Sequence, residues 1–187
     1  FLYPGDLEFS NGAQIFVEAA TQMAERCPSA RFILACRVKT PAALDARAEL
    51  RREVDKRGLT DRILFLGRVE DMPTLLGSVD AVVLPVDTLY AKVDIPLVVL
   101  EGMALGIPAV VSDLPALGEL AGLGEGVCLV PQSDSEALAR ALTDLVDKPT
   151  TLKRGGTGAR RTVQQHFSLE GMIAQYESLY AEVIDGR

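Results

Sequence analysis

Short apolar runs alternate with longer amphipathic segments along this chain. Each run is almost continuous in apolar residues, which is typical of parallel strands that are buried on both faces. The runs predict six strands, at residues 1–3, 31–36, 63–66, 81–85, 109–112 and 127–130. Strands that alternate with helices in this way indicate repeated βα units.

The amphipathic segments between the runs predict helices with one apolar face. In the first of them, apolar residues recur at spacings of three and four from Ile15 to Met23, and Pro28 follows as a stop signal. The predicted helices cover residues 13–26, 41–57, 72–77, 97–105, 135–147, 151–165 and 169–184. The glycine-rich segment 155–158 follows no strand and lacks the Lys-Ser/Thr pair of a phosphate loop, so it predicts a break in its helix. Six strands joined by right-handed crossovers predict an α/β fold with an open, doubly wound, Rossmann-like sheet, in one domain over residues 1–187.

Composition and charge narrow the function. Apolar residues make up 48% of the 187 residues and charged residues 24%, which is typical of a globular chain. The 19 basic and 26 acidic residues give a net charge of −7, which disfavours a nucleic-acid partner. The longest stretch without charge, residues 102–112, is much shorter than the roughly 20 residues of a spanning helix. We therefore expect neither nucleic-acid binding nor a transmembrane segment.

The cysteines indicate a compartment. Cys27, Cys36 and Cys128 are odd in number and widely spaced, which fits neither a disulfide framework nor a zinc site. This pattern favours a reduced, cytoplasmic setting.

Candidate chemistry follows the predicted strands, because ligands of such sheets bind beyond the carboxyl ends of the strands. Gly5 follows the first strand, Arg37 and Lys39 follow the second, and Arg68 and Val69 follow the third. Three cations that converge at this edge could hold a diphosphate. A solvated loop charge is an equally good interpretation of each cation taken singly.

The helix around residues 97–105 is the most informative segment, and Pro96 suits its first turn, where the missing N–H of proline costs nothing. The free N–H groups of Leu97, Val98 and Val99 are expected to point out of the helix start, a geometry that binds anions such as phosphate. Glu101 is the one charge in this apolar helix, and burial of an unpaired carboxylate is costly. A ligand's hydroxyl pair could satisfy it. From composition alone, a salt bridge or a solvent-facing side chain is the favoured interpretation.

The order of these motifs resembles the C-terminal, donor-binding domain of group 1 (family 4) glycosyltransferases of the GT-B architecture. The most specific part of the resemblance covers residues 96–113. It extends over essentially the whole chain through Leu2-Tyr3-Pro4-Gly5, Asn11-Gly12, residues 61–67, 81–85 and 126–131, and His166-Phe167-Ser168.

The resemblance implies roles for several residues. Glu101 falls on the second glutamate of an E-x7-E pair that binds the ribose hydroxyls, which favours a ligand role for it. The amides of Leu97 and Val98 match those that hold the diphosphate, and the loop at Arg68-Val69 is similar to the one that contacts the base.

Three positions depart from the family pattern. The first glutamate of the pair falls on Val93, although Asp94 follows directly and could take its place after a small loop shift. The Arg and Lys that clamp the diphosphate after the first strand are replaced by Asp6 and Asn11. Either Arg37 and Lys39 compensate, or the site is weakened.

The resemblance implies the donor-binding half of an enzyme that moves a sugar from a nucleotide diphosphate-sugar to an acceptor, with retention at the anomeric carbon. No metal or other cofactor is implied. The chain opens at Phe1 inside a predicted strand, which predicts a piece of a longer, two-domain protein. A missing N-terminal domain would hold the acceptor, carry the unknown catalytic residues and make any peripheral membrane contact, so that this domain alone is expected to be inactive.

Two alternatives remain open at the level of the sequence. One is a degenerate, non-catalytic binding or assembly module of the same architecture, which Asp6, Asn11 and Val93 motivate. The other is a nucleotide-sugar epimerase.

Overall fold

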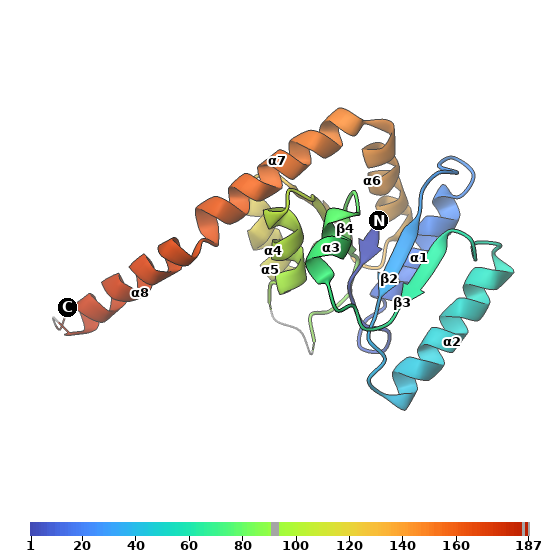
Figure 1. Ribbon diagram of the computed structural model, residues 1–187, viewed down its shortest axis with the longest axis horizontal. Helices are drawn as coiled ribbons and strands as arrows, with labels where there is room; N and C mark the ends of the chain where they lie inside the picture. Colours follow the sequence, from blue (N-terminus) through green and yellow to red (C-terminus); the bar gives the residue numbers. More distant parts are fainter. Residues whose placement is uncertain (91–93, 185, 187) are drawn as a thin grey trace.

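A single parallel sheet organises the chain. The computed structural model describes residues 1–90, 94–184 and 186, and in this part six strands pair in the order β3-β2-β1-β4-β5-β6 (Figure 1). The predicted doubly wound sheet is confirmed, and every strand lies inside its predicted run. The strands are β1 (Leu2–Tyr3), β2 (Phe32–Ala35), β3 (Ile63–Leu66), β4 (Val82–Leu84), β5 (Ala109–Ser112) and β6 (Val127–Val130).

The order in which strands are added to the sheet reverses at β1, although all the strands stay parallel. Leu2 pairs with Ile33 of β2 on one side and with Val82 of β4 on the other. The chain moves from β1 outward to β2 and β3, and then returns to β4 and moves the other way. Right-handed crossovers in opposite directions place their helices on opposite faces of the sheet, which opens a crevice at the carboxyl ends of β1 and β4.

Eight helices flank or extend this sheet within the described residues. The bounds of α3, α6 and α8 agree with the prediction, whereas α1 ends at Met23, three residues earlier than expected. The helices are α1 (Gly12–Met23), α2 (Pro41–Lys56), α3 (Met72–Gly77), α4 (Leu97–Ala104), α5 (Pro115–Gly122), α6 (Ser135–Asp147), α7 (Pro149–His166) and α8 (Leu169–Ile184).

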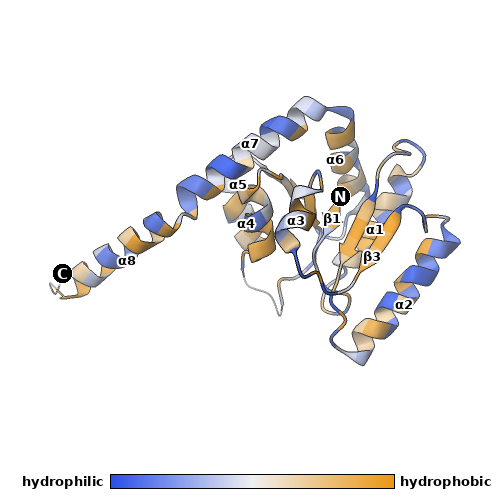
Figure 2. Cartoon of the chain, in the orientation of Figure 1, coloured by the Kyte–Doolittle hydropathy of each residue, from blue (hydrophilic) through white to orange (hydrophobic). Residues whose placement is uncertain are grey.

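The core lies between the sheet and its helices. Figure 2 shows the strands in the apolar colour, while α2 and α7 carry broad polar faces. Under β1 and β2 the core is aromatic: the Phe16 ring lies 5.8 Å from that of Tyr3 and 5.6 Å from that of Phe32, between centroids. Burial of these large side chains helps to hold β1 in the middle of the sheet.

Helix α5 was not predicted from the sequence. Pro115 occupies its first turn, and Leu117 and Leu120 are fully buried at a spacing of three. The helix is only eight residues long and contains Gly118 and Gly122, so helix propensity did not favour it. Burial of its leucine pair outweighs that low propensity.

The predicted helix break at residues 155–158 is wrong, because these glycines lie inside the continuous helix α7. A Cβ atom on Gly156 would come within 2.2 Å of the carbonyl oxygen of Gly106, and one on Gly158 would come within 2.4 Å of the Glu125 Cβ. The glycines are therefore required by close packing of α7 against two loops, rather than by a turn.

Helix α7 also holds the far end of α4. The guanidinium group of Arg160 donates hydrogen bonds to the carbonyl oxygens of Ala104 (3.1 Å) and Leu105 (3.0 Å). A cation at this position satisfies carbonyls that the helix leaves unpaired and complements the helix dipole. Helix α4 is thus held at its carboxyl end by a helix from the end of the chain.

Helix α8 extends away from the sheet (Figure 1). None of its residues is buried, and it exposes a series of large apolar side chains. They are Leu169, Met172, Ile173, Tyr176, Leu179, Tyr180, Val183 and Ile184. No described helix combines the length and apolar content needed to cross a bilayer.

All three cysteines carry free thiols. Cys27 and Cys36 are buried, and Cys128 is exposed. Burial raises the pKa of the Cys36 thiol to about 12. Burial of its sulfur also raises the pKa of Cys128, with a smaller contribution from Asp144.

We expect the glycines of α7 to respond to alanine in opposite ways. Gly156→Ala forces its new methyl group into the Gly106 carbonyl and should lower the free energy of unfolding by about 1–3 kcal/mol. The matched control is Gly155→Ala, whose Cβ would lie 3.4 Å from Pro108, close to an ordinary contact. Alanine has a better helix propensity than glycine, so Gly155→Ala should leave the free energy of unfolding unchanged or raise it by up to about 1 kcal/mol. Urea unfolding followed by circular dichroism measures both, and equal effects would contradict the packing argument.

The thiols should react in a defined order. Because only the thiolate attacks a disulfide reagent, the folded chain at mildly alkaline pH should release one equivalent of chromophore, from Cys128. Unfolding in urea should expose all three thiols. Rapid reaction of the Cys36 thiol in the folded chain, identified by mass spectrometry of the labelled peptide, would show that β2 is not packed as described.

Candidate functional site

A cleft of about 350 Å³ lies at the carboxyl ends of β1 to β4, where the sheet reverses direction. Its walls come from the loops after β1, β2 and β3 and from the start of α4. The structure brings together six of the ten predicted site residues along this cleft, namely Gly5, Arg37, Lys39, Val69, Pro96 and Val98. Sequence reasoning did not assign the other lining residues to the site, among them Asp6, Leu7, Glu8, Phe9 and Met72.

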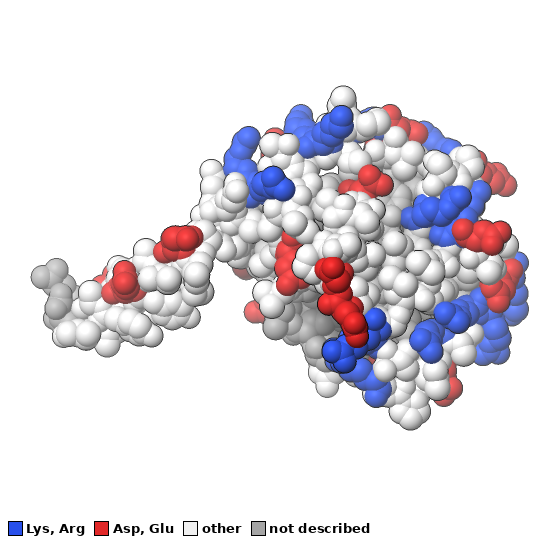
Figure 3. Space-filling model, in the orientation of Figure 1, with Lys and Arg blue, Asp and Glu red and all other residues white. Residues whose placement is uncertain are grey.

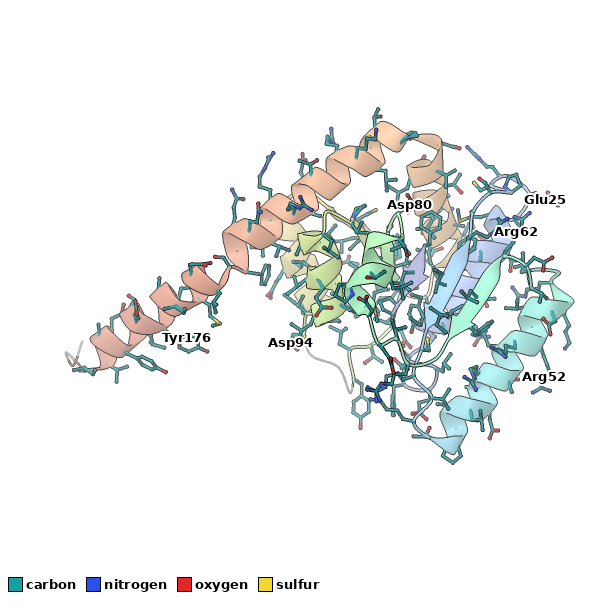
Figure 4. The ribbon with its side chains drawn as sticks, viewed as in Figure 1. Glu25, Arg52, Arg62, Asp80, Asp94 and Tyr176 are labelled. Carbon is teal, nitrogen blue, oxygen red and sulfur yellow. The ribbon has the colours of Figure 1, made fainter. Side chains whose placement is uncertain are left out.

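A larger hollow, of about 450 Å³, lies at the amino ends of the strands, opposite the cleft. Its lining includes Phe1, Arg31 and Asp80, and the last of these is labelled in Figure 4. These residues lie just before strands β1, β2 and β4, at the amino ends of the strands. Ligands of doubly wound sheets bind at the carboxyl ends of the strands, so the cleft near Gly5 is the stronger candidate.

The loop after β1 is shaped by the carboxylate of Asp6. Its Oδ1 accepts hydrogen bonds from the backbone N–H groups of Glu8 (3.1 Å), Phe9 (2.7 Å) and Ser10 (3.1 Å). Its Oδ2 accepts a further bond from the Ser10 hydroxyl at 3.2 Å. Asp6, where the resemblance implies a basic residue, therefore has a structural role, because its carboxylate satisfies amides that a loop would otherwise leave unpaired.

Tyr3 supports this loop from below. Its hydroxyl donates to the carbonyl oxygen of Asp6 at 3.0 Å, and burial raises its pKa well above the ordinary value, so that it stays a neutral donor. A Cβ on Gly5 would lie 2.1 Å from the ring carbon Cζ of Tyr3, and one on Gly12 would lie 2.8 Å from its hydroxyl. Both glycines are needed for the chain to pass over the ring.

Hydrogen bonds join the same loop to three neighbouring loops. The Thr40 hydroxyl, at the start of α2, donates to Glu8 Oε2 at 2.6 Å. The backbone N–H of Asn11 donates to Asp87 Oδ1 (3.1 Å), and its side-chain amide donates to the Ser133 hydroxyl (2.7 Å). Ser133 has a φ of 56°, a left-handed conformation that is uncommon for serine and that its contact with Asn11 helps to hold.

The cations of the cleft are available to a ligand. Arg37 and Lys39 are exposed, and neither forms a hydrogen bond or ion pair with another described residue. Asp6 and Glu8 line the same cleft, so its two cations face two carboxylates. Figure 3 shows basic and acidic side chains close together below α3, toward this end of the sheet.

The start of α4 differs in one respect from the prediction. Pro96 is the N-cap rather than a residue of the first turn, and its carbonyl oxygen accepts the N–H of Val99 at 2.9 Å. Two amides of the predicted three, those of Leu97 and Val98, therefore lack a partner among the described residues. Val98 lines the cleft, whereas the Leu97 side chain is 67% exposed and lies outside its lining.

Glu101 is exposed, so the argument that a buried carboxylate must be satisfied there is wrong. Its side chain forms no hydrogen bond or ion pair with any described residue, so the solvent-facing interpretation is confirmed and the salt bridge is not formed within this part of the chain. Glu101 follows Val98 by three positions, which places both on the same face of α4. The carboxylate lies outside the lining of the cleft, one turn along the helix that forms its wall.

The remaining predicted residues lie at the margin. Arg68 and Asp94 are exposed and outside the lining of the cleft, and Figure 4 places Asp94 beside the start of α4. Val93, which the resemblance places at the first glutamate of the pair, lies outside the described residues. The described residues contain no group of three or more His, Cys, Asp or Glu side chains that could hold a metal ion.

Comparison with known proteins relates this geometry to curated relatives. Residues 1–148 match the family of glycosyl transferases group 1. The chain is 30% identical over 182 residues to the lipopolysaccharide core biosynthesis mannosyltransferase LpsB of Rhizobium meliloti, covering 94% of this chain and 50% of that protein. It is 29% identical over 180 residues to the mannosyltransferase LpcC of Rhizobium leguminosarum, covering 96% and 50%. The chain thus spans about half the length of these curated relatives.

Solved structures share the fold. Sucrose-phosphate synthase from Thermosynechococcus elongatus superposes with a TM-score of 0.82 at 25% identity, over 100% of this chain and 45% of that chain. Anabaena HepE in complex with UDP gives 0.83 at 22% identity, over 97% and 48%. The C-terminal domain of the group 1 protein LpcC from Francisella tularensis gives 0.76 at 24% identity, over 90% and 85%. With a family match that covers residues 1–148, the chain belongs to the group 1 glycosyltransferases.

Proposed function

We propose that this chain is the donor-binding half of a glycosyltransferase that moves a sugar from a nucleoside diphosphate-sugar to an acceptor, with retention at the anomeric carbon. One observation carries the proposal. Arg37 and Lys39, two cations with no partner among the described residues, line a cleft at the point where the strand order reverses. The first amides of α4, which also lack partners in this part of the chain, lie at the same cleft.

The diphosphate would lie between the cations and the helix. Arg37 and Lys39 offer charge-assisted hydrogen bonds to phosphate oxygens, and the amides of Leu97 and Val98 offer two more donors on the positive end of the α4 dipole. The same groups would stabilise the charge that develops on the leaving diphosphate. We propose that this set of donors binds the diphosphate without a metal ion.

The nucleoside would extend along the walls of the cleft. Val69 and Met72 form an apolar side suited to a base, with Arg68 at its outer edge. Glu101, one turn beyond Val98 and without a partner among the residues that the structure describes, is the candidate for the ribose hydroxyls. Asp94 is the candidate for a contact to the donor sugar.

The acceptor would be held by a second domain. The chain spans about half the length of its curated relatives, and the apolar side chains of α8 lack a packing partner among the described residues. Helix α8 carries Glu170, Glu177 and Glu182 but no Lys or Arg, which suits a protein surface better than an anionic membrane. We propose a cytoplasmic enzyme whose catalytic residues on the acceptor side lie in that domain, so that this chain alone binds the donor without transferring it.

A non-catalytic module is the second candidate, and the acidic residues in the cleft favour it. Asp6 and Glu8 balance the charge of Arg37 and Lys39, so a diphosphate gains less from the cleft than from a purely basic one. Donor titration separates the two functions.

Calorimetric titration of UDP and GDP into the chain tests the donor site, with EDTA present in a parallel series. We expect binding that EDTA leaves unchanged and that Glu101→Ala weakens about tenfold or more, because hydrogen bonds to a charged carboxylate are lost. Glu182→Ala, at an exposed carboxylate near the end of α8, is the matched control and should bind normally. A folded chain that binds neither nucleotide would favour the non-catalytic module.

The cation loop should act on phosphate rather than on the nucleoside. We expect Arg37→Ala to weaken UDP binding about tenfold or more and to leave uridine binding unchanged, because a guanidinium group recognises the diphosphate. The control is Arg52→Ala, an exposed arginine on the outer side of α2 in Figure 4. Equal losses for UDP and uridine, or no loss, would remove Arg37 from the diphosphate site.

A further inference from the structure

Two exposed aromatic side chains meet at the mouth of the cleft. Phe9, which lines the cleft, is 46% exposed, and Tyr90 is 71% exposed. Their ring centroids lie 6.2 Å apart with the ring planes at 59°. Phe9 comes from the loop after β1 and Tyr90 from the loop after β4, so the pair bridges the two sides of the reversal point.

Both residues are anchored through their backbones. The N–H of Phe9 donates to Asp6 Oδ1 at 2.7 Å, the shortest of the three bonds that shape its loop. The N–H of Tyr90 donates to the hydroxyl of Thr88 at 3.0 Å. The backbone at both positions is therefore held by hydrogen bonds, while the two side chains stay exposed.

The strongly exposed aromatic side chains of this chain occur in pairs. It contains six Phe, four Tyr and no Trp. Four of these ten aromatic side chains are strongly exposed, and they form two pairs: Phe9 with Tyr90, and Tyr176 with Tyr180 on α8. Apolar surface that stays exposed beside a cleft is typical of a ligand-binding surface.

We propose that Phe9 and Tyr90 form a stacking platform for a pyranose ring at the mouth of the cleft. This inference rests on the proposed donor-binding function and adds a sugar subsite to it. The C–H groups on one face of a pyranose carry partial positive charge, and the faces of aromatic rings are negative, so the two surfaces attract while the sugar hydroxyls stay solvated. The ligand part that stacks is uncharged and needs neither Arg37 nor Lys39.

The position of the pair agrees with this assignment. The proposed diphosphate donors and the apolar wall at Val69 lie within the cleft, whereas Tyr90 lies at its mouth through its contact with Phe9. A group attached to the distal phosphate would emerge there. The 59° angle between the rings gives no parallel slot for a flat base, but a puckered ring can contact both faces.

The pyranose could belong to the donor or to the acceptor, and a comparison of ligands distinguishes the two. UDP, UDP-glucose, GDP and GDP-mannose are titrated into the chain, and the ratio of affinities with and without the sugar isolates the sugar contact. For a donor subsite, Phe9→Ala and Tyr90→Ala should each lower this ratio about three- to tenfold and leave the affinity for UDP or GDP unchanged.

Three variants serve as controls. Phe9→Leu keeps apolar bulk without an aromatic face and should lose most of the sugar contribution, as Phe9→Ala does. Tyr176→Ala removes an aromatic side chain of similar exposure from α8, far from the cleft in Figure 4, and should change nothing. Thermal unfolding of each variant verifies that the fold is retained.

The acceptor arm uses methyl α-glucoside and methyl α-mannoside, added with and without nucleotide and followed by the ring signals of Phe9 and Tyr90 in NMR spectra. For an acceptor subsite, the glycosides shift these signals and Phe9→Ala abolishes glycoside binding. The ratio of affinities for the nucleotide with and without its sugar then stays the same in the variants. Failure of UDP and GDP to bind would refute the proposed function. The titration with methyl glycosides would still show whether Phe9 and Tyr90 bind a pyranose. If neither the ratio nor the ring signals respond to sugar, the platform is refuted and the pair is a contact surface for the second domain.

Discussion

The cleft depends on the convergence of three backbone N–H groups on the carboxylate of Asp6. This interaction gives the loop after β1 its shape, with Tyr3 beneath it and the glycines at its two ends passing over the ring. The same loop then reaches the start of α2 through Glu8 and the loops after β4 and β6 through Asn11. An acid at this position organises the wall of the cleft and adds negative charge to it, so one residue affects both its geometry and its affinity for anions.

Helix α4 connects the cleft to the end of the chain. Its first amides and Val98 lie at the cleft, while its carboxyl end is held by Arg160 of α7. Helix α7 can approach so closely because Gly156 and Gly158 have no side chains to collide with the loops it covers. Packing far from the cleft therefore sets the position of the helix that we propose holds the diphosphate.

The architecture was predictable because it depends on patterns of burial. Six apolar runs became six parallel strands, and the carboxyl ends of the first three placed Gly5, Arg37, Lys39 and Val69 at one edge. The errors occur where tertiary contacts override local signals: Leu117 and Leu120 bury a helix of low propensity, and the α7 glycines serve close packing instead of ending a helix. The argument that Glu101 needs a ligand assumed a buried carboxylate because its helix is apolar, yet apolar neighbours in sequence do not determine which side of a helix faces solvent. The Phe9–Tyr90 pair could not be predicted, because the two rings meet only through the folded loops after β1 and β4.

The central claim is that the cleft at the carboxyl ends of β1 to β4 binds a nucleoside diphosphate. Backbone amide shifts in heteronuclear NMR spectra, recorded while UDP or GDP is added to the labelled chain, test it most directly. We predict the largest shifts at residues 5–9, at 37–39 and at the start of α4, where the cleft cations and the first amides of the helix lie. Shifts confined to the amino ends of the strands, around Phe1 and Asp80, would contradict the claim. The absence of shifts with both nucleotides would also contradict it.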